Sequence, residues 1–197
     1  MSVKHDDTRP RLVTHLPAFA WGLGGVAVFL GQGITRLAGR SLEAIDAGLT
    51  TTQWIAMILW IAFMAHAEGL RGFHRRFSPR VVARAIALGE HATPLRIALA
   101  PAFCMSYFHA TRRGLVVAWS VSLGIIGLVM VVSQLSQPWR GIVDAGVVVG
   151  LAIGEVSLLW YALRALRGQR PPMDPNLPEE DRDPSDARVT AASGGSS

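Results

Sequence analysis

The sequence predicts an all-α fold, an integral membrane four-helix bundle, and two observations carry this prediction. Half of the 197 residues are hydrophobic and only 17% are charged. The charges are also segregated, because four long stretches contain almost none. A helix needs about 20 mostly apolar residues to cross the hydrocarbon core of a bilayer, and each stretch is long enough. A soluble domain of this length could not cover four helices that are apolar on all sides. The predicted transmembrane helices cover about residues 17–35, 50–67, 114–133 and 141–163.

The first predicted span follows a polar cytoplasmic tail, residues 1–15. We expect this span to remain in the protein as a membrane helix. Asp6 and Asp7 in the tail, and the length of the apolar run, are not typical of a cleaved signal peptide. The connection to the second span, residues 36–48, is predicted to contain a brief interfacial helix.

The segment between the second and third spans, residues 68–113, is expected to contain interfacial helices within 78–111. Ser78 followed by Pro79 is typical of a helix start, because Ser caps free N–H groups and Pro suits the first helical position. Gly89 is typical of a helix end. The sequence therefore predicts a separate short helix over these residues.

Arg80 and Arg84 lie together on one side of that short helix, apart from an apolar stripe. Such a helix is expected either in the cytoplasmic headgroup layer or packed on its own bundle. The apolar run that follows, within 95–111, is interrupted by Pro101 and is too short to span. It is interpreted as interfacial or re-entrant, or as an extension of the third span.

The end of the chain differs from the membrane domain, which is predicted over residues 16–170. Residues 171–197 contain five prolines and six acidic residues and almost no large apolar side chains. This composition cannot bury enough surface to offset the entropy of ordering, so a disordered cytoplasmic tail is predicted.

Lys and Arg near the spans predict the orientation. The N-terminal tail carries three, the segment 68–113 carries eight and the start of the C-terminal tail carries three, whereas the two other loops share three. The positive-inside rule then places both termini and the segment 68–113 in the cytoplasm. Lys4 is the only lysine in the chain, and this arginine-rich composition is typical of bacteria with GC-rich genomes. We therefore expect a multi-pass protein of a bacterial cytoplasmic (inner) membrane.

Three glycines of the fourth span, Gly146, Gly150 and Gly154, form a tandem GxxxGxxxG pattern. Small residues at this spacing leave a flat strip on which another helix can approach closely. The strip is predicted to be a helix-packing site, occupied by the glycine-rich first span or by a second copy of the protein.

Two acidic residues of the fourth span are candidate functional groups. Glu155 is about nine residues from the basic end of the helix, and an ionised side chain at that depth is costly unless it is paired or protonated. Asp144 lies eleven residues earlier, on nearly the same face. The alternatives are structural: Asp144 as a cap of the helix start, and Glu155 as a hydrogen-bonded residue of the bundle, with Ser120, Ser122 or His66 as its partner.

His66 near the end of the second span is a third candidate polar group, at a depth that allows contact with Glu155. Glu68 is expected to pair with Arg71, three residues later. Lipid headgroups are the predicted counter-charge for the basic residues of the middle segment. The candidate headgroup residues are Arg75, Arg76, Arg80, Arg84, Arg112 and Arg113.

No cofactor, metal site or catalytic residue is predicted. His74, His91, His109 and Cys104 lack the spacing of metal ligands, and no catalytic motif is present. No nucleic-acid partner is expected, whereas a second copy or another membrane protein is a predicted partner. The function that these features favour is a non-catalytic membrane subunit, scaffold or assembly factor. A proton-linked transporter using Glu155 is the alternative, followed by a membrane-embedded enzyme with a site at the cytoplasmic mouth.

Overall fold

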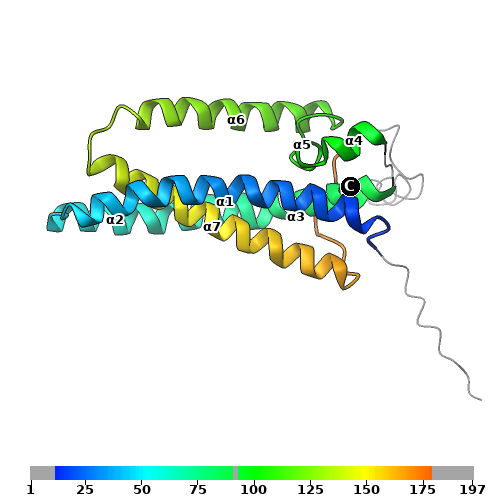
Figure 1. Ribbon diagram of the computed structural model, residues 1–197, viewed down its shortest axis with the longest axis horizontal. Coiled ribbons are helices and arrows are strands. Elements are labelled where there is room, and N and C mark those ends of the chain that lie inside the picture. Colours follow the sequence, from blue (N-terminus) through cyan, green and yellow to red (C-terminus); the bar gives the residue numbers. More distant parts are fainter. Residues whose placement is uncertain (1–11, 91–92, 179–197) are drawn as a thin grey trace, which may run out of the picture.

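The computed structural model describes residues 12–90 and 93–178. In this part of the chain every regular element is a helix, and four helical stretches are long and apolar enough to cross a membrane. The predicted fold class, an all-α membrane protein with four spanning helices, is thereby confirmed. The four stretches are α1 (Leu16–Asp46), Thr51–Glu90, α6 (Arg112–Val132) and α7 (Trp139–Leu166) (Figure 1).

α1 continues eleven residues beyond the predicted end of the first span, so the brief separate helix expected in residues 36–48 does not exist. The extension is stabilised by α7, which runs antiparallel to α1. At one end Gly141 of α7 lies against Ala44 and the carbonyl of Arg40, and further along Leu151 lies against Gly33.

The second spanning stretch contains three segments wound end to end: α2 (Thr51–Met64), the π-helix η1 (Ala65–Phe77) and α3 (Ser78–Glu90). It begins at a capping box. The N–H of Gln53 donates to Thr50 Oγ1 over 3.4 Å, and the N–H of Thr50 donates to Gln53 Oε1 over 2.9 Å. This reciprocal pair satisfies two N–H groups that a helix start leaves open.

The predicted helix start at Ser78 is wrong, because the chain is already helical there, with φ −59° and ψ −46°. Ser78 does not cap its own helix. Its hydroxyl donates instead to the carbonyl of Gly154 in α7 over 3.2 Å, and Ser78 is completely buried. A Ser-Pro pair therefore serves here as a contact between two helices rather than as a boundary.

The π-helix η1 keeps one side of the second stretch turned toward α7. π-helices form i→i+5 hydrogen bonds and mostly occur as single turns, so a run of 13 residues is long. Met64, Gly69, His74 and Ser78, spaced by four or five residues, all meet α7 or lie beside residues that do. An α-helix with a period of 3.6 residues would turn these positions progressively away.

α3 belongs to the core, together with the short helices α4 (Pro94–Ala98) and α5 (Ala100–Cys104) that follow it. Every residue from 78 to 88 except Arg80 is buried, which decides between the two placements expected for this helix in favour of packing on the bundle. α5 packs on α1 where Gly22 and Gly25 leave room for Cys104 and Pro101. Burial raises the pKa of the Cys104 thiol to about 12.

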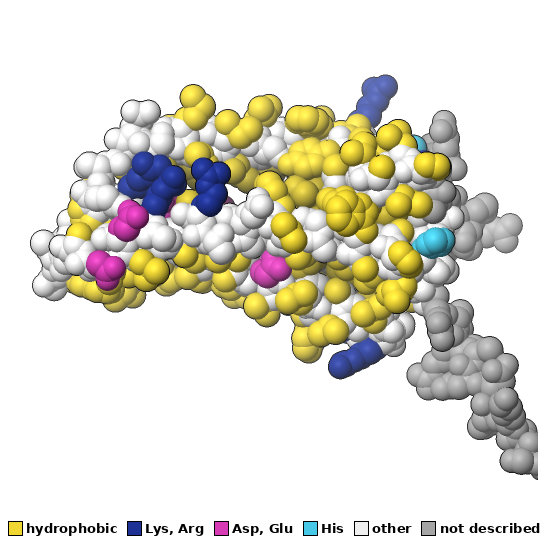
Figure 2. Space-filling view, in the orientation of Figure 1, with side chains coloured by type: hydrophobic (Ala, Val, Ile, Leu, Met, Phe, Trp, Pro, Cys, Tyr) yellow, Lys and Arg dark blue, Asp and Glu magenta, His cyan; other side chains and the backbone are white. Residues whose placement is uncertain are grey.

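α6 stands apart from the three other spanning helices, which pack together (Figure 1). None of the residues in its most apolar 18-residue window is buried. The preceding loop contacts the first half of α6: the hydroxyls of Tyr107 and Ser122 lie 2.5 Å apart, and Trp119 Nε1 donates to the carbonyl of Tyr107 over 3.3 Å. Figure 2 shows hydrophobic side chains along α6 and over much of the neighbouring bundle.

The described part of the C-terminal tail, residues 171–178, is docked on the protein. Leu177 is 5% exposed, and the N–H of Thr111 donates to the carbonyl of Asn176 over 3.0 Å. The prediction of disorder throughout 171–197 is therefore wrong for this segment, which we call the strap. Residues 179–197 and 1–11 lie outside the described residues.

Candidate functional site

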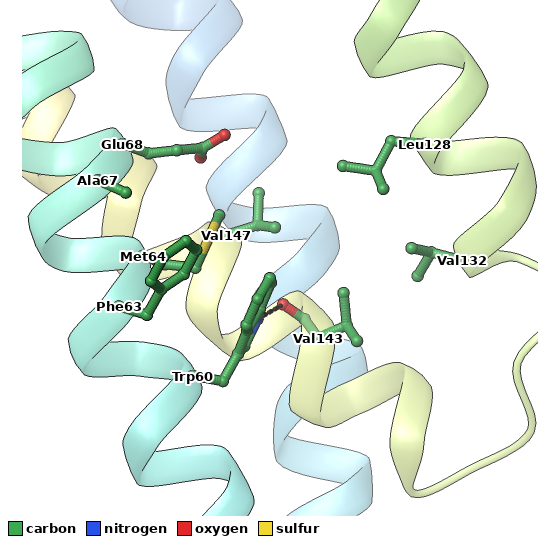
Figure 3. A pocket seen from close by; sticks show the side chains of 9 residues that line it. All are labelled: Trp60, Phe63, Met64, Ala67, Glu68, Leu128, Val132, Val143 and Val147. Carbon is green, nitrogen blue, oxygen red and sulfur yellow. Dashed lines mark hydrogen bonds between the residues drawn. The ribbon is translucent and has the colours of Figure 1, made fainter.

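A cavity of about 530 Å³ lies between α6 and the rest of the bundle (Figure 3). Its wall is almost entirely apolar, and α2, η1, α6 and α7 all contribute to it. A cavity of this size and polarity is typical of sites that hold an apolar ligand or chain segment. It is lined by Trp60, Phe63, Met64, Ala67, Glu68, Leu128, Val132, Val143 and Val147.

Glu68 is the one ionisable side chain among the nine that line the cavity. Its Oε2 lies 3.2 Å from the point where a Cβ on Gly150 would be, so it rests on the glycine strip of α7. The expected pair with Arg71 does not form in the described chain. Arg71 lines a separate hollow of about 240 Å³ with Arg76. The cause is the π-helical winding, in which residues three apart no longer lie one above the other.

Trp60 forms another part of the cavity wall, away from Glu68. Its Nε1 donates a hydrogen bond to the main-chain carbonyl of Val143 over 3.0 Å, drawn as the dashed line in Figure 3. Its ring stacks on Phe63 with ring centroids 5.6 Å apart. Because a helical carbonyl already accepts a bond within α7, this additional donor ties α2 to α7 without requiring a polar side chain on α7.

The glycine strip faces the second stretch rather than α1 or a second copy. Gly146 lies against Trp60 and Met64, Gly150 against Glu68, and Gly154 against the ring of Phe73. Large side chains of the second spanning stretch therefore fill the strip. The sequence identifies the strip as a packing site but predicts other occupants, because the spacing of small residues does not encode the partner.

Asp144 lies on a different side of α7, toward α1. It is 4% exposed and sits in the second turn, so it does not cap the helix, whose N-cap position is Pro138. Arg40 Nη1 of α1 is 4.0 Å from Asp144 Oδ2, which has no hydrogen-bond partner. The interpretation of Asp144 as a helix cap is therefore wrong, because α7 begins earlier than the predicted span.

Glu155 lies four residues after Leu151, on the side of α7 that meets α1. It is partly buried, and its Oε2 is closed to solvent without a hydrogen-bond partner. The partners considered for it are placed elsewhere. Ser120 is exposed on α6, Ser122 is bound to Tyr107, and His66 is exposed on η1. None of the three has a described bond to Glu155. The two carboxyl groups of α7 thus share the α1 side of the helix, away from the cavity.

Arg84 is not a headgroup residue, which corrects the expectation for it. It is completely buried, and its guanidinium donates to four main-chain carbonyls: Nε to Phe103 over 2.6 Å, Nη1 to Pro175 over 2.8 Å, and Nη2 to Phe108 and His109 over 3.2 and 3.1 Å. Its carbon Cζ also lies 4.2 Å from the centre of the Phe103 ring. Of the other candidate headgroup residues, Arg80 is partly buried, and Arg75, Arg76, Arg112 and Arg113 are exposed.

The histidines and the cysteine have separate surroundings. His74 Nδ1 is 2.9 Å from the Ser157 hydroxyl of α7, Cys104 is buried beneath Gly22, and His109 is bonded to Arg96. His91 lies outside the described residues. Within the described ranges no three His, Cys, Asp or Glu side chains come together as metal ligands would.

Sequence patterns do not single out Glu68 or Tyr107. A local pair is the simplest explanation of Glu68 in the sequence, and Tyr107 lies in a loop without any motif. One signal is available for Glu68: a carboxyl group in the middle of the long helical run is as unusual there as Glu155 is in the fourth span.

No protein-family model matches the chain, and no curated protein or solved structure shows significant similarity to it. The chemistry of the site therefore rests on its own residues: an apolar space next to a detached helix, with one carboxylate at its wall.

Proposed function

We propose that this protein is a non-catalytic subunit, scaffold or assembly factor that acts by helix–helix association within a bacterial inner membrane. Both termini are proposed to lie in the cytoplasm, on the side of the exposed arginines Arg75, Arg76, Arg112 and Arg113, which bind anionic headgroups. The partner is another membrane protein or a second copy of the chain.

The observation that supports this proposal is the isolation of α6. Its side chains are apolar on all sides, and large ones such as Leu123, Ile125 and Met130 are more than half exposed. A Cβ added to Gly124 or Gly127 would meet no atom within 4 Å outside the helix's own backbone. Transmembrane helices associate through van der Waals contact at small residues, and these glycines provide it without disturbing the bundle.

Photo-crosslinking from single positions tests the proposal. A photoreactive residue at Ile125 of α6 is expected to give a specific protein adduct in membranes. The same residue at Val156, exposed to a similar degree on α7, is the matched control and is expected to give mainly lipid adducts. Equal protein adducts, or none, at the two positions would contradict the proposal. An adduct of twice the chain mass indicates a second copy, and any other mass indicates a different partner.

A proton-linked carrier is the second candidate, supported by the carboxyl groups of Asp144 and Glu155. Both have an oxygen that is closed to solvent and has no hydrogen-bond partner in the described structure, on the same side of α7. Buried carboxyl groups in membrane spans are found along proton pathways. Reconstituted vesicles with a proton gradient test this function: Glu155→Gln should abolish the flux, whereas Glu43→Gln, on the exposed side of α1, should preserve it. A flux that survives Glu155→Gln would exclude this mechanism.

A further inference from the structure

Positive charges from three separate elements gather at one end of the bundle. Arg80 of α3 has Arg76 of η1 and Arg113 of α6 as charged neighbours, and Asp174 of the strap is the one acidic neighbour that acts on it. Arg80 thus has two like charges and one opposite charge near it. The strap also lies beside the start of α6, because a Cβ on Gly114, the residue after Arg113, would be 4.0 Å from the Cβ of Asn176. Because like charges repel in a partly buried setting, this arrangement favours binding of a further anion.

Arg80 has one nitrogen atom without a hydrogen-bond partner among the described residues. Its Nε is closed to solvent and has no hydrogen-bond acceptor. A buried donor of a charged group that is left unpaired is costly. Arg84, one helical turn later, shows the contrast, because all of its nitrogen atoms donate to carbonyls. All nitrogen atoms of Arg84 are therefore bonded within the fold, whereas Arg80 keeps a donor that is not used by the fold.

The strap determines where Asp174 lies. Arg84 holds the carbonyl of Pro175, Thr111 holds the carbonyl of Asn176, and Leu177 is buried behind them. The N–H of Asn176 donates to Asp174 Oδ1 over 2.6 Å. The carboxylate is thus fixed beside Arg80 by its own turn, and no ion pair within 4 Å joins the two side chains in the described structure. Asp174 lowers the positive potential without saturating the arginines.

We infer that Arg76, Arg80 and Arg113 form a binding site for a phosphate-bearing anion, and that Asp174 of the strap competes with this anion. Guanidinium groups bind phosphate oxygens through paired, charge-assisted hydrogen bonds. The site lies where α6 begins. In the membrane topology of the proposed function, on which this inference rests, that is the level of the headgroup phosphates. Arg76 also borders the hollow of about 240 Å³ that it shares with Arg71, which leaves room beside the site.

A phospholipid headgroup and free inorganic phosphate offer the same chemistry, so the test contains both. The full-length protein is placed in phosphatidylcholine nanodiscs, and phosphatidic acid or inorganic phosphate is titrated in while thermal unfolding is followed. Phosphatidic acid is expected to raise the Tm of the parent protein in a saturable manner. The same rise with millimolar inorganic phosphate would identify the free ion as a ligand, and its absence would restrict the site to a headgroup.

The variants decide whether the named residues form the site. Arg80→Gln and Arg113→Gln should each weaken the apparent affinity about tenfold, the size expected when a charge-assisted hydrogen bond is lost. Arg36→Gln removes the same charge from an exposed position of α1 and should leave the affinity unchanged. Asp174→Asn should strengthen binding several-fold, because it removes the competing charge while keeping the side-chain acceptor for Asn176.

Three results would overturn the inference. The first is a parent protein that responds equally to phosphatidylcholine alone and to added phosphatidic acid and phosphate. The second is a loss of affinity in Arg36→Gln as large as that in Arg80→Gln and Arg113→Gln, which would mean general attraction to charge. The third is unchanged or weaker binding by Asp174→Asn, which would remove the competitor role of the strap. Because Arg113 is exposed, its variant remains informative even if Arg80→Gln reduces folding.

Discussion

α7 and α6 are both apolar helices that follow one another in the chain, yet they are used in opposite ways. The most apolar window of α7 has a mean hydropathy of 2.0 and is 39% buried, whereas that of α6 has a mean hydropathy of 2.6 and is not buried at all. Glycines of α7 are covered by Trp60, Glu68 and Phe73, and Gly124 and Gly127 of α6 face open space. Hydrophobicity therefore directs a helix into the membrane, and steric fit directs it into the bundle.

The largest expected effect concerns Gly154, one of the covered glycines of α7. In Gly154→Leu, even the Cβ would lie 2.6 Å from the Phe73 ring, so α7 and η1 must move apart. We expect the free energy of unfolding in detergent to fall by about 3 kcal/mol or more, at the upper end of overpacking. Thermal unfolding followed by circular dichroism measures it. A variant as stable as the parent would show that α7 does not depend on this contact.

Removal of residues 171–197 is expected to have the next largest effect. The truncation exposes the site of Leu177 and leaves Arg84 Nη1 without the carbonyl of Pro175, so we expect a loss of about 2–4 kcal/mol. A shorter truncation that keeps residues up to 178 is the control and should preserve the stability. If both truncations behave alike, the strap contributes nothing to the fold.

A smaller effect is expected at the pair of hydroxyl groups that helps to hold α6 on the preceding loop. Tyr107→Phe removes the hydroxyl that lies 2.5 Å from Ser122 Oγ but keeps the ring packed on Trp119. The cost should be about 1 kcal/mol in stability. Distances between spin labels on α6 and α7 should become more broadly distributed. Unchanged distance distributions would mean that the loops at its two ends already fix α6.

The smallest expected effect concerns Gly124, one of the open glycines of α6. Gly124→Leu places its side chain in open space, and the stability of the isolated protein should change by about 0.5 kcal/mol or less. The protein adduct formed from Ile125 should nevertheless disappear, because a bulky side chain keeps a partner helix at a distance. Destabilisation equal to that of Gly154→Leu would show that α6 does pack on its own bundle in the membrane.

The number of spans was predictable from the sequence, because a stretch without charged residues and long enough for the bilayer has few alternatives. The ends of the spans were not. α1 continues through Arg36 and Arg40 to Asp46, where Ala44 packs on Gly141 of α7 and Arg40 lies 4.0 Å from Asp144, a residue about a hundred positions away. Hydropathy averaged along the chain contains no information on such a pair.

The burial of Arg84 and the docking of the strap could not be predicted for a similar reason. Helical spacing correctly placed Arg80 and Arg84 on one side of a helix, but a main-chain carbonyl has no signature in the sequence. The acceptors of Arg84 come from α5, from the loop after it and from Pro175, which lies within a segment whose composition indicates disorder. Composition describes the average behaviour of 27 residues, whereas docking of the strap depends on Leu177 and on two carbonyl groups.

The contact between Arg84 and Pro175 also has a consequence for biosynthesis. The two residues are 91 positions apart, and translation at about 5–20 residues per second separates their synthesis by roughly 5–20 s. During this interval the guanidinium of Arg84 lacks one of its final acceptors and relies on water for it. We therefore expect the burial of this guanidinium to be completed only after Pro175 has been synthesised.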